Sequence, residues 1–123
     1  MGRKPTVRGL KKKADKLWSL IIRAKGKCEV CGETQYLNPH HVIGRRNHAV
    51  RFLLRNGVCL CSGCHTFRTR SAHNDPQWFM EWFKNNRPDD FLSISIKKNH
   101  IIKRTLEDYQ NLVDTLQEKL NGK

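Results

Sequence analysis

The sequence contains few acidic residues, few apolar residues and no long hydrophobic run. Its 123 residues include 11 Asp and Glu against 24 Lys and Arg, which gives a net charge of +13. Only 37% of the residues are hydrophobic, below the roughly 45–50% typical of globular domains. No apolar run approaches the ~20 residues of a membrane span. These values predict one small domain with a thin core and a polyanionic partner, and they exclude a membrane protein.

The first residues, Met1 to Thr6, lack the apolar stretch of a signal peptide. The chain has five cysteines, and four of them lie in two CxxC pairs. An odd count with this pairing is typical of metal binding in a reducing compartment and not of a disulfide framework. We therefore expect a cytoplasmic protein with no membrane partner.

The positive charge is concentrated at the N-terminus. Residues 1–27 hold ten Lys and Arg and a single acid, Asp15. We expect residues 1–9 to form a flexible basic arm and residues 10–26 to form an amphipathic helix that stops at Gly26. The lysines on this helix either form a solvated face or contact phosphates, and their density favours phosphate contact. They are Lys11, Lys12, Lys13 and Lys16.

The last third of the chain is expected to be mainly helical, over residues 75–120. Asp75 and Pro76 suit the N-cap and the first position of a helix. Residues 92–96 alternate as a short strand would, although a loop or a helical turn fits them equally well. Residues 105–120 form a second amphipathic pattern, whose apolar stripe serves either the core or a dimer, so the oligomeric state stays open.

The two CxxC pairs predict a structural zinc site. A CxxC turn points two thiolates at one centre, and a second turn completes a tetrahedral set with no open position. Such a site also supplies stability that a thin core lacks. Cys59 lies outside both pairs, and we expect it to be a small buried hydrophobe. The expected ligands are Cys28, Cys31, Cys61 and Cys64.

The segment between Glu33 and Asp75 contains no acidic residue. An ion bound there must be held by imidazoles or thiolates. Two short antiparallel strands are expected at residues 41–43 and 58–60, with a helix starting near Cys64. Adjacent histidines on a strand point to opposite faces, so His40 and His41 can address different targets.

The string from Cys28 to His65 (CxxC, His-His-Val-Ile, Arg-Asn-Gly-Val-Cys-Leu-Cys, CxxCH) resembles the HNH endonucleases, and the flanking text is similar to small phage or prophage members. The resemblance implies an α+β fold, with a ββα-metal core at about 28–73 and flanking helices at 10–26 and 75–120 in one domain, 10–123. It further implies the cytoplasm of a bacterial host, and DNA and other phage DNA-processing proteins as partners.

The resemblance also assigns roles by position. His41 matches the general base, and His40 and His65 match ligands of the catalytic divalent ion. Asn56 matches the asparagine that orients the base and its loop. Many members carry a further histidine where this chain has Thr69. Either His73 completes the ligand set, if the helix after Cys64 ends early, or water does.

The expected function is metal-dependent hydrolysis of DNA, by nicking or by double-strand cleavage, with 5′-phosphate and 3′-hydroxyl products as the resemblance implies. Imidazole ligands suit Mn²⁺, Ni²⁺, Co²⁺ or Zn²⁺ better than Mg²⁺, and activity with several of these ions is expected. Arg45, Arg46 and Arg68 are candidates to bind the phosphate. The alternatives are a non-catalytic, zinc-stapled DNA-binding module and a protein that binds or cuts RNA.

Overall fold

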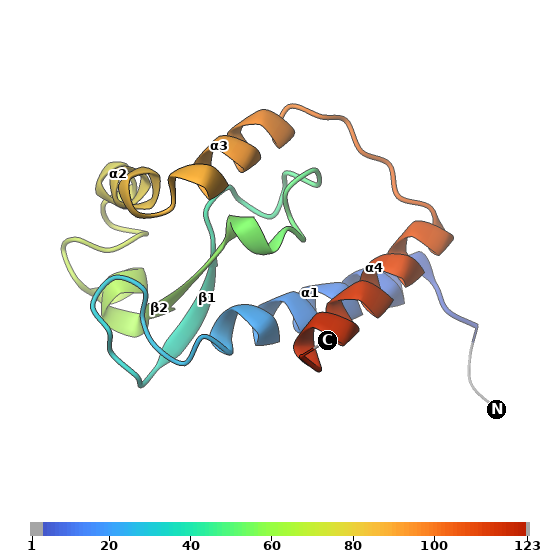
Figure 1. The fold of residues 1–123 in the computed structure, drawn as a ribbon, viewed down its shortest axis with the longest axis horizontal. Coiled ribbons are helices and arrows are strands. Elements are labelled where there is room, and N and C mark those ends of the chain that lie inside the picture. The colour runs from blue at the N-terminus through green and yellow to red at the C-terminus, as the bar shows by residue number, and fades with distance from the viewer. Residues whose placement is uncertain (1–3, 123) are drawn as a thin grey trace.

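The computed structural model describes residues 4–122 and has an α+β architecture, as expected. A two-stranded antiparallel hairpin lies at the centre, with helices α1 and α4 on one side and α2 and α3 on the other (Figure 1). The elements in chain order are α1 (Val7–Arg23), β1 (Leu37–His41), the 3₁₀ turn η1 (Leu54–Asn56), β2 (Gly57–Cys61), the short π-helix η2 (Gly63–Phe67), α2 (Pro76–Asn86), α3 (Pro88–Lys97) and α4 (Leu106–Leu120).

Helix α1 begins earlier than the apolar spacing indicates. The side chain of Thr6 accepts a hydrogen bond from Gly9 N at 3.0 Å and caps a helix that starts at Val7. The expected boundary at Leu10 is therefore wrong, and part of the expected basic arm is helical. The first three residues of the arm, which we expect to be flexible, lie outside the described residues. The helix ends at Arg23, and Gly26 adopts a positive φ of 78° in the following turn.

The hairpin pairs Leu37 with Cys61 and His41 with Gly57. The expected strand at 41–43 is displaced, because β1 runs from Leu37 to His41 instead. Asparagine and proline are uncommon in strands, so Asn38 and Pro39 do not predict one. Pro39 is tolerated here because β1 is an edge strand of a two-stranded sheet. The expected strand at 58–60 is confirmed within β2.

The C-terminal helices follow their capping residues. Asp75 accepts a hydrogen bond from Trp78 N and caps α2, as expected. Residues 92–96 are helical and belong to α3, which begins at Pro88. Phe91 and Ile94 of this helix face the core. Of the strand, loop and helical alternatives, the helical one is confirmed.

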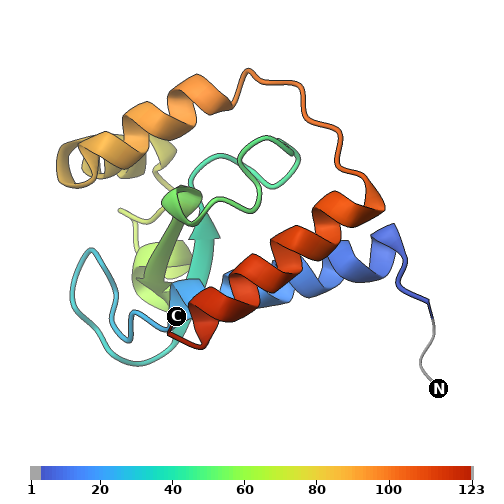
Figure 2. The ribbon, with the colours of Figure 1, turned by 45° about the vertical axis from the view of Figure 1, so that its right-hand side comes forward.

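Helix α4 lies beside α1 and runs in the same direction (Figures 1 and 2). Its apolar stripe therefore packs within the chain. The contact between α1 and α4 forms one hydrophobic cluster. A second hydrophobic cluster, which contains three of the four candidate zinc ligands, joins the hairpin to α2 and α3. Between these two clusters, Trp18 and Ile22 of α1 pack on Cys59 of β2. In the part of the chain that the structure describes, no helix is long and apolar enough to cross a membrane.

Candidate active site and metal centres

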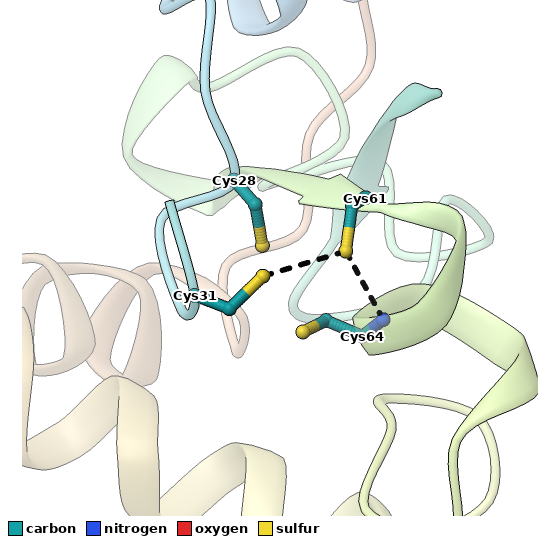
Figure 3. Close-up of side chains that lie close together, drawn as sticks. All are labelled: Cys28, Cys31, Cys61 and Cys64. Atoms are coloured by element: carbon teal, nitrogen blue, oxygen red, sulfur yellow. Dashed lines mark hydrogen bonds between the residues drawn. The ribbon is translucent and has the colours of Figure 1, made fainter. Parts of the chain in front are cut away.

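Four cysteines converge at the end of the hairpin (Figure 3). Cys28 and Cys31 come from the loop after α1, Cys61 from the last position of β2, and Cys64 from η2. Their sulfur atoms all lie within 4.8 Å of one another, and the Sγ atoms of Cys31 and Cys61 are 3.6 Å apart. A tetrahedral zinc with 2.3 Å bonds requires a sulfur separation of about 3.8 Å. The group is therefore close to the geometry that a zinc ion needs.

The thiol electrostatics favour a bound dication. The backbone N–H of Glu33 lowers the pKa of Cys31 to about 7. Burial raises the pKa of Cys61 and of Cys64, because a desolvated thiolate is costly and its neighbours are also thiols. A divalent ion would offset this cost by pairing with the thiolates. Cys59 is fully buried against α1 and outside the group, which confirms its expected role.

Three histidines form a second group. His40 comes from β1, His65 from η2 and His73 from the loop before α2, and their candidate ligand nitrogens lie within 4.8 Å of one another. The Nε2 atoms of His65 and His73 are 3.1 Å apart. Imidazole nitrogens bound at 2.0–2.1 Å in a tetrahedral site are separated by about 3.4 Å. This group also fits a metal ion.

The short length of η2 explains how His73 joins the group. The helix ends at Phe67, and the chain then returns so that Ala72 N donates to Cys64 O at 2.8 Å and His73 N donates to His65 O at 3.1 Å. The helix near Cys64 is confirmed, but it has only five residues. Thr69 is exposed and is not part of the group. Of the two alternatives, the structure favours His73 as the third ligand.

Two of these histidines, His40 and His65, are poorly basic. Burial, followed by the charges of its two partners, lowers the pKa of His40 to about 3. Burial and then His73 lower the pKa of His65. Neutral imidazoles keep a lone pair for a metal ion, and no carboxylate lies in the group to reduce the charge of that ion.

His41 follows His40 on β1 but makes different contacts. Its ring stacks on Trp18, with ring centroids 3.8 Å apart and planes 10° from parallel. Its Nε2 lies 3.0 Å from the carbonyl oxygen of Arg51. A carbonyl only accepts, so Nε2 carries the proton and Nδ1 keeps the lone pair in neutral His41. Burial is the main cause that lowers the pKa of His41, opposed by the Arg51 carbonyl and Asp15.

Asn56 holds the loop that follows β1. It is fully buried, and its Oδ1 accepts from Ile43 N at 2.8 Å. Its Nδ2 donates to Ile43 O at 2.9 Å and to Val50 O at 3.2 Å. Since Val50 precedes Arg51, one side chain ties both segments that contact His41. This placement agrees with the orienting role that the resemblance implies.

The three-histidine group and His41 share one open cavity of about 460 Å³. It is lined by Pro39, His40, His41, Gly44, Arg45, His65 and His73. Among the three candidate phosphate-binding arginines, the structure brings only Arg45 into this lining. The Arg68 guanidinium instead donates to Cys64 Sγ at 3.4 Å, beside the cysteine group.

The lysines expected to contact DNA lie on α1. Three of them, which we call the α1 lysines, line a shallow groove with Leu120 of α4, and they are Lys12, Lys13 and Lys16. Lys11 is half-buried and contributes to the lowered pKa of His48. Contact of these lysines with DNA stays a prediction.

Sequence reasoning missed three residues around His41. In the sequence, Trp18 fits the apolar stripe of α1, and Arg51 is one of several arginines in the acid-free segment. Asp15 accepts two hydrogen bonds from Arg51, at 3.0 and 2.6 Å. The signal available in the sequence was that Asp15 is the one acid among the first 27 residues.

Comparison of the chain with protein-family models, with curated proteins and with solved structures gives no match. The resemblance to the HNH endonucleases therefore rests on the motif residues themselves. What the structure adds is the placement of His40, His41 and His65 in one cavity, together with His73.

Proposed function

We propose that this protein is a metal-dependent endonuclease that hydrolyses phosphodiester bonds in DNA. One observation carries the proposal: a three-imidazole group, a histidine whose Nδ1 has no hydrogen-bond partner among the described residues, and an arginine share one open cavity. The net charge of +13 supports a polyanionic substrate.

His40, His65 and His73 would hold the catalytic divalent ion. A bound ion supplies Lewis acidity toward a phosphate oxygen and the leaving oxygen. Three imidazole ligands suit Mn²⁺, Ni²⁺, Co²⁺ or Zn²⁺ better than Mg²⁺, and we expect each of the first four ions to support some cleavage.

His41 acts as the general base. Its Nδ1 takes a proton from a water molecule, and the water oxygen forms a bond to phosphorus as the bond to O3′ breaks. The hydrogen bond from Nε2 to the Arg51 carbonyl stabilises the imidazolium that forms. Arg45, the one arginine in the cavity lining, binds a non-bridging phosphate oxygen. The departing O3′ takes up a proton from solvent water, and the reaction leaves the 5′-phosphate and 3′-hydroxyl ends that the resemblance implies.

The cysteine group would hold a structural zinc. Four protein ligands leave no open position for substrate. The zinc would join the loop after α1 to the end of β2 and to η2, and η2 carries His65. In this way the structural ion would help to fix the position of His65.

Cleavage of supercoiled plasmid tests the proposal. We expect nicked or linear product with Mn²⁺ or Ni²⁺ and none with excess EDTA. His41→Ala should lower the rate by about 10²–10⁴-fold, the usual contribution of a general base. His100→Ala is the matched control, because His100 is exposed in the loop after α3.

Structured RNA is tested in parallel, and faster cleavage of RNA than of plasmid would overturn DNA as the substrate. Absence of cleavage with every ion, from zinc-loaded protein that still binds DNA, would support the non-catalytic DNA-binding module instead.

A further inference from the structure

Helix α1 contacts the immediate surroundings of the candidate base. Asp15 accepts from Arg51 Nε at 3.0 Å and from Arg51 Nη2 at 2.6 Å, in a paired arrangement of carboxylate and guanidinium. The Arg51 guanidinium also donates to Arg45 O at 3.4 Å. Arg51 is largely buried, and this fixed side chain belongs to the residue whose carbonyl accepts from His41.

Trp18 supports His41 from the same helix, one turn after Asp15. Its indole is 1% exposed, and Nε1 donates to Leu53 O at 2.9 Å. The ring therefore has a fixed orientation, and it stacks in parallel on the imidazole. Gly57 of β2 permits this approach, because a Cβ there would collide with Ile22 and Trp18.

Packing of α1 on α4 does not require these contacts, although Trp18 also packs on β2. The face of α1 that packs on α4 is formed by Leu10, Ala14 and Leu17. A partly buried ion pair such as Asp15 with Arg51 is weak evidence for stability, because desolvation of the charges offsets their attraction. The shared property of Asp15 and Trp18 is their contact with His41 or with the residue that accepts from it.

We propose that Asp15 and Trp18 are positioning residues that hold His41 in its Nε2–H tautomer and in the orientation that presents Nδ1 to water. Asp15 acts through Arg51, whose carbonyl it keeps aligned with Nε2. Trp18 acts by stacking, which prevents rotation of the imidazole out of the cavity. Helix α1 is thereby a component of the cleavage machinery. This role rests on the proposed function, since it concerns the base of that reaction.

The test measures single-turnover cleavage, DNA affinity and Mn²⁺ affinity in zinc-loaded variants. Asp15→Asn keeps the size of the side chain but not its charge, and Trp18→Leu removes the stacked ring. Trp18→Phe keeps an aromatic ring and tests rescue. Asp114→Asn is the matched control for a lost acid, since Asp114 is exposed on α4 and bonds only Gln110 among the contacts described.

We expect the cleavage rate constant to fall by about tenfold in Asp15→Asn and by about tenfold to a hundredfold in Trp18→Leu, because a base displaced by about 1 Å loses up to about 10²-fold. Affinities for DNA and Mn²⁺ should stay within about twofold. Trp18→Phe should recover most of the rate, and Asp114→Asn should match the wild type.

A spectroscopic readout does not depend on cleavage. The ¹⁵N chemical shifts of His41 should report the Nε2–H tautomer in the wild type and a mixture of tautomers in Asp15→Asn. This measurement remains informative for any variant that folds, as judged by its zinc content and circular dichroism.

Unchanged rates in both Asp15→Asn and Trp18→Leu, with normal cleavage by the wild type, would overturn the positioning role alone. Loss of rate only in proportion to loss of folded protein or of affinity would also overturn it. Absence of cleavage by the wild type would overturn the proposed function, which makes the two failures distinguishable.

Discussion

Replacement of Asn56 by alanine is predicted to cost stability as well as activity. Three hydrogen bonds from one fully buried amide would be lost, two with the backbone of Ile43 and one with Val50 O. Each lost bond costs roughly 1 kcal/mol, and more where the partner stays buried without water. We therefore expect Asn56→Ala to lower the free energy of unfolding by about 3 kcal/mol, a large part of the 5–15 kcal/mol typical of a domain.

Urea unfolding followed by tryptophan fluorescence measures this loss, at a fixed concentration of free zinc because bound metal adds to stability. Asn47→Ala is the matched control. Asn47 is half-exposed, and water can replace its bonds to Lys98 O and Ala49 N. It should cost less than about 1 kcal/mol.

Asn56→Asp separates the two directions of bonding. Its carboxylate can accept from Ile43 N but cannot donate to either carbonyl, and it places a charge in a fully buried position. It should be at least as destabilising as alanine at neutral pH. A loss below about 1 kcal/mol for Asn56→Ala, or an aspartate tolerated like asparagine, would refute the assignment of Asn56 as the residue that ties the two segments around His41.

Three further predictions concern the metal, the phosphate and the basic helix. Cys61→Ala should lose the bound zinc and unfold, because a structural zinc is worth about 10–16 kcal/mol, whereas Cys59→Ala should keep one zinc per chain by elemental analysis. Arg45→Ala should lower the cleavage rate by at least about tenfold, while Arg46→Ala should not, in the same plasmid assay. Glutamine at the α1 lysines should flatten the dependence of log affinity on log salt by about 0.9 per lost phosphate contact, and an unchanged slope would show that these lysines are only solvated.

The capping residues and the cysteine spacing could be interpreted from the sequence because their physics is local. A CxxC turn brings two thiolates together whatever surrounds it, and Asp75 before Pro76 satisfies helix N–H groups within one turn. The cysteine group and the start of α2 were predicted for this reason. The start of α1 was missed by three residues, since Thr6 caps a turn that contains no apolar residue except Val7.

Other features depend on tertiary contacts. Residues 92–96 alternate in hydrophobicity, yet Leu92 and Ile96 are 60% and 57% exposed and only Ile94 is buried. A helix that packs through Phe91 and Ile94 is compatible with the same residues. The local sequence does not reveal the surface on which this helix packs. The contacts of His41 with Trp18 and Arg51 likewise join segments far apart in the chain. Hydrophobic periodicity within one segment does not predict such a contact.

The dependence of the cleavage rate on Mn²⁺ concentration, measured with zinc kept in the cysteine group, tests the central claim most directly. For the wild type, the rate should rise to a plateau, with half-saturation at the concentration that half-fills the histidine group in calorimetry. His65→Ala should shift both midpoints upward by at least about tenfold. His41→Ala should lower the plateau and leave the midpoint in place. A rate independent of Mn²⁺, or one that His65→Ala does not change, would contradict the account.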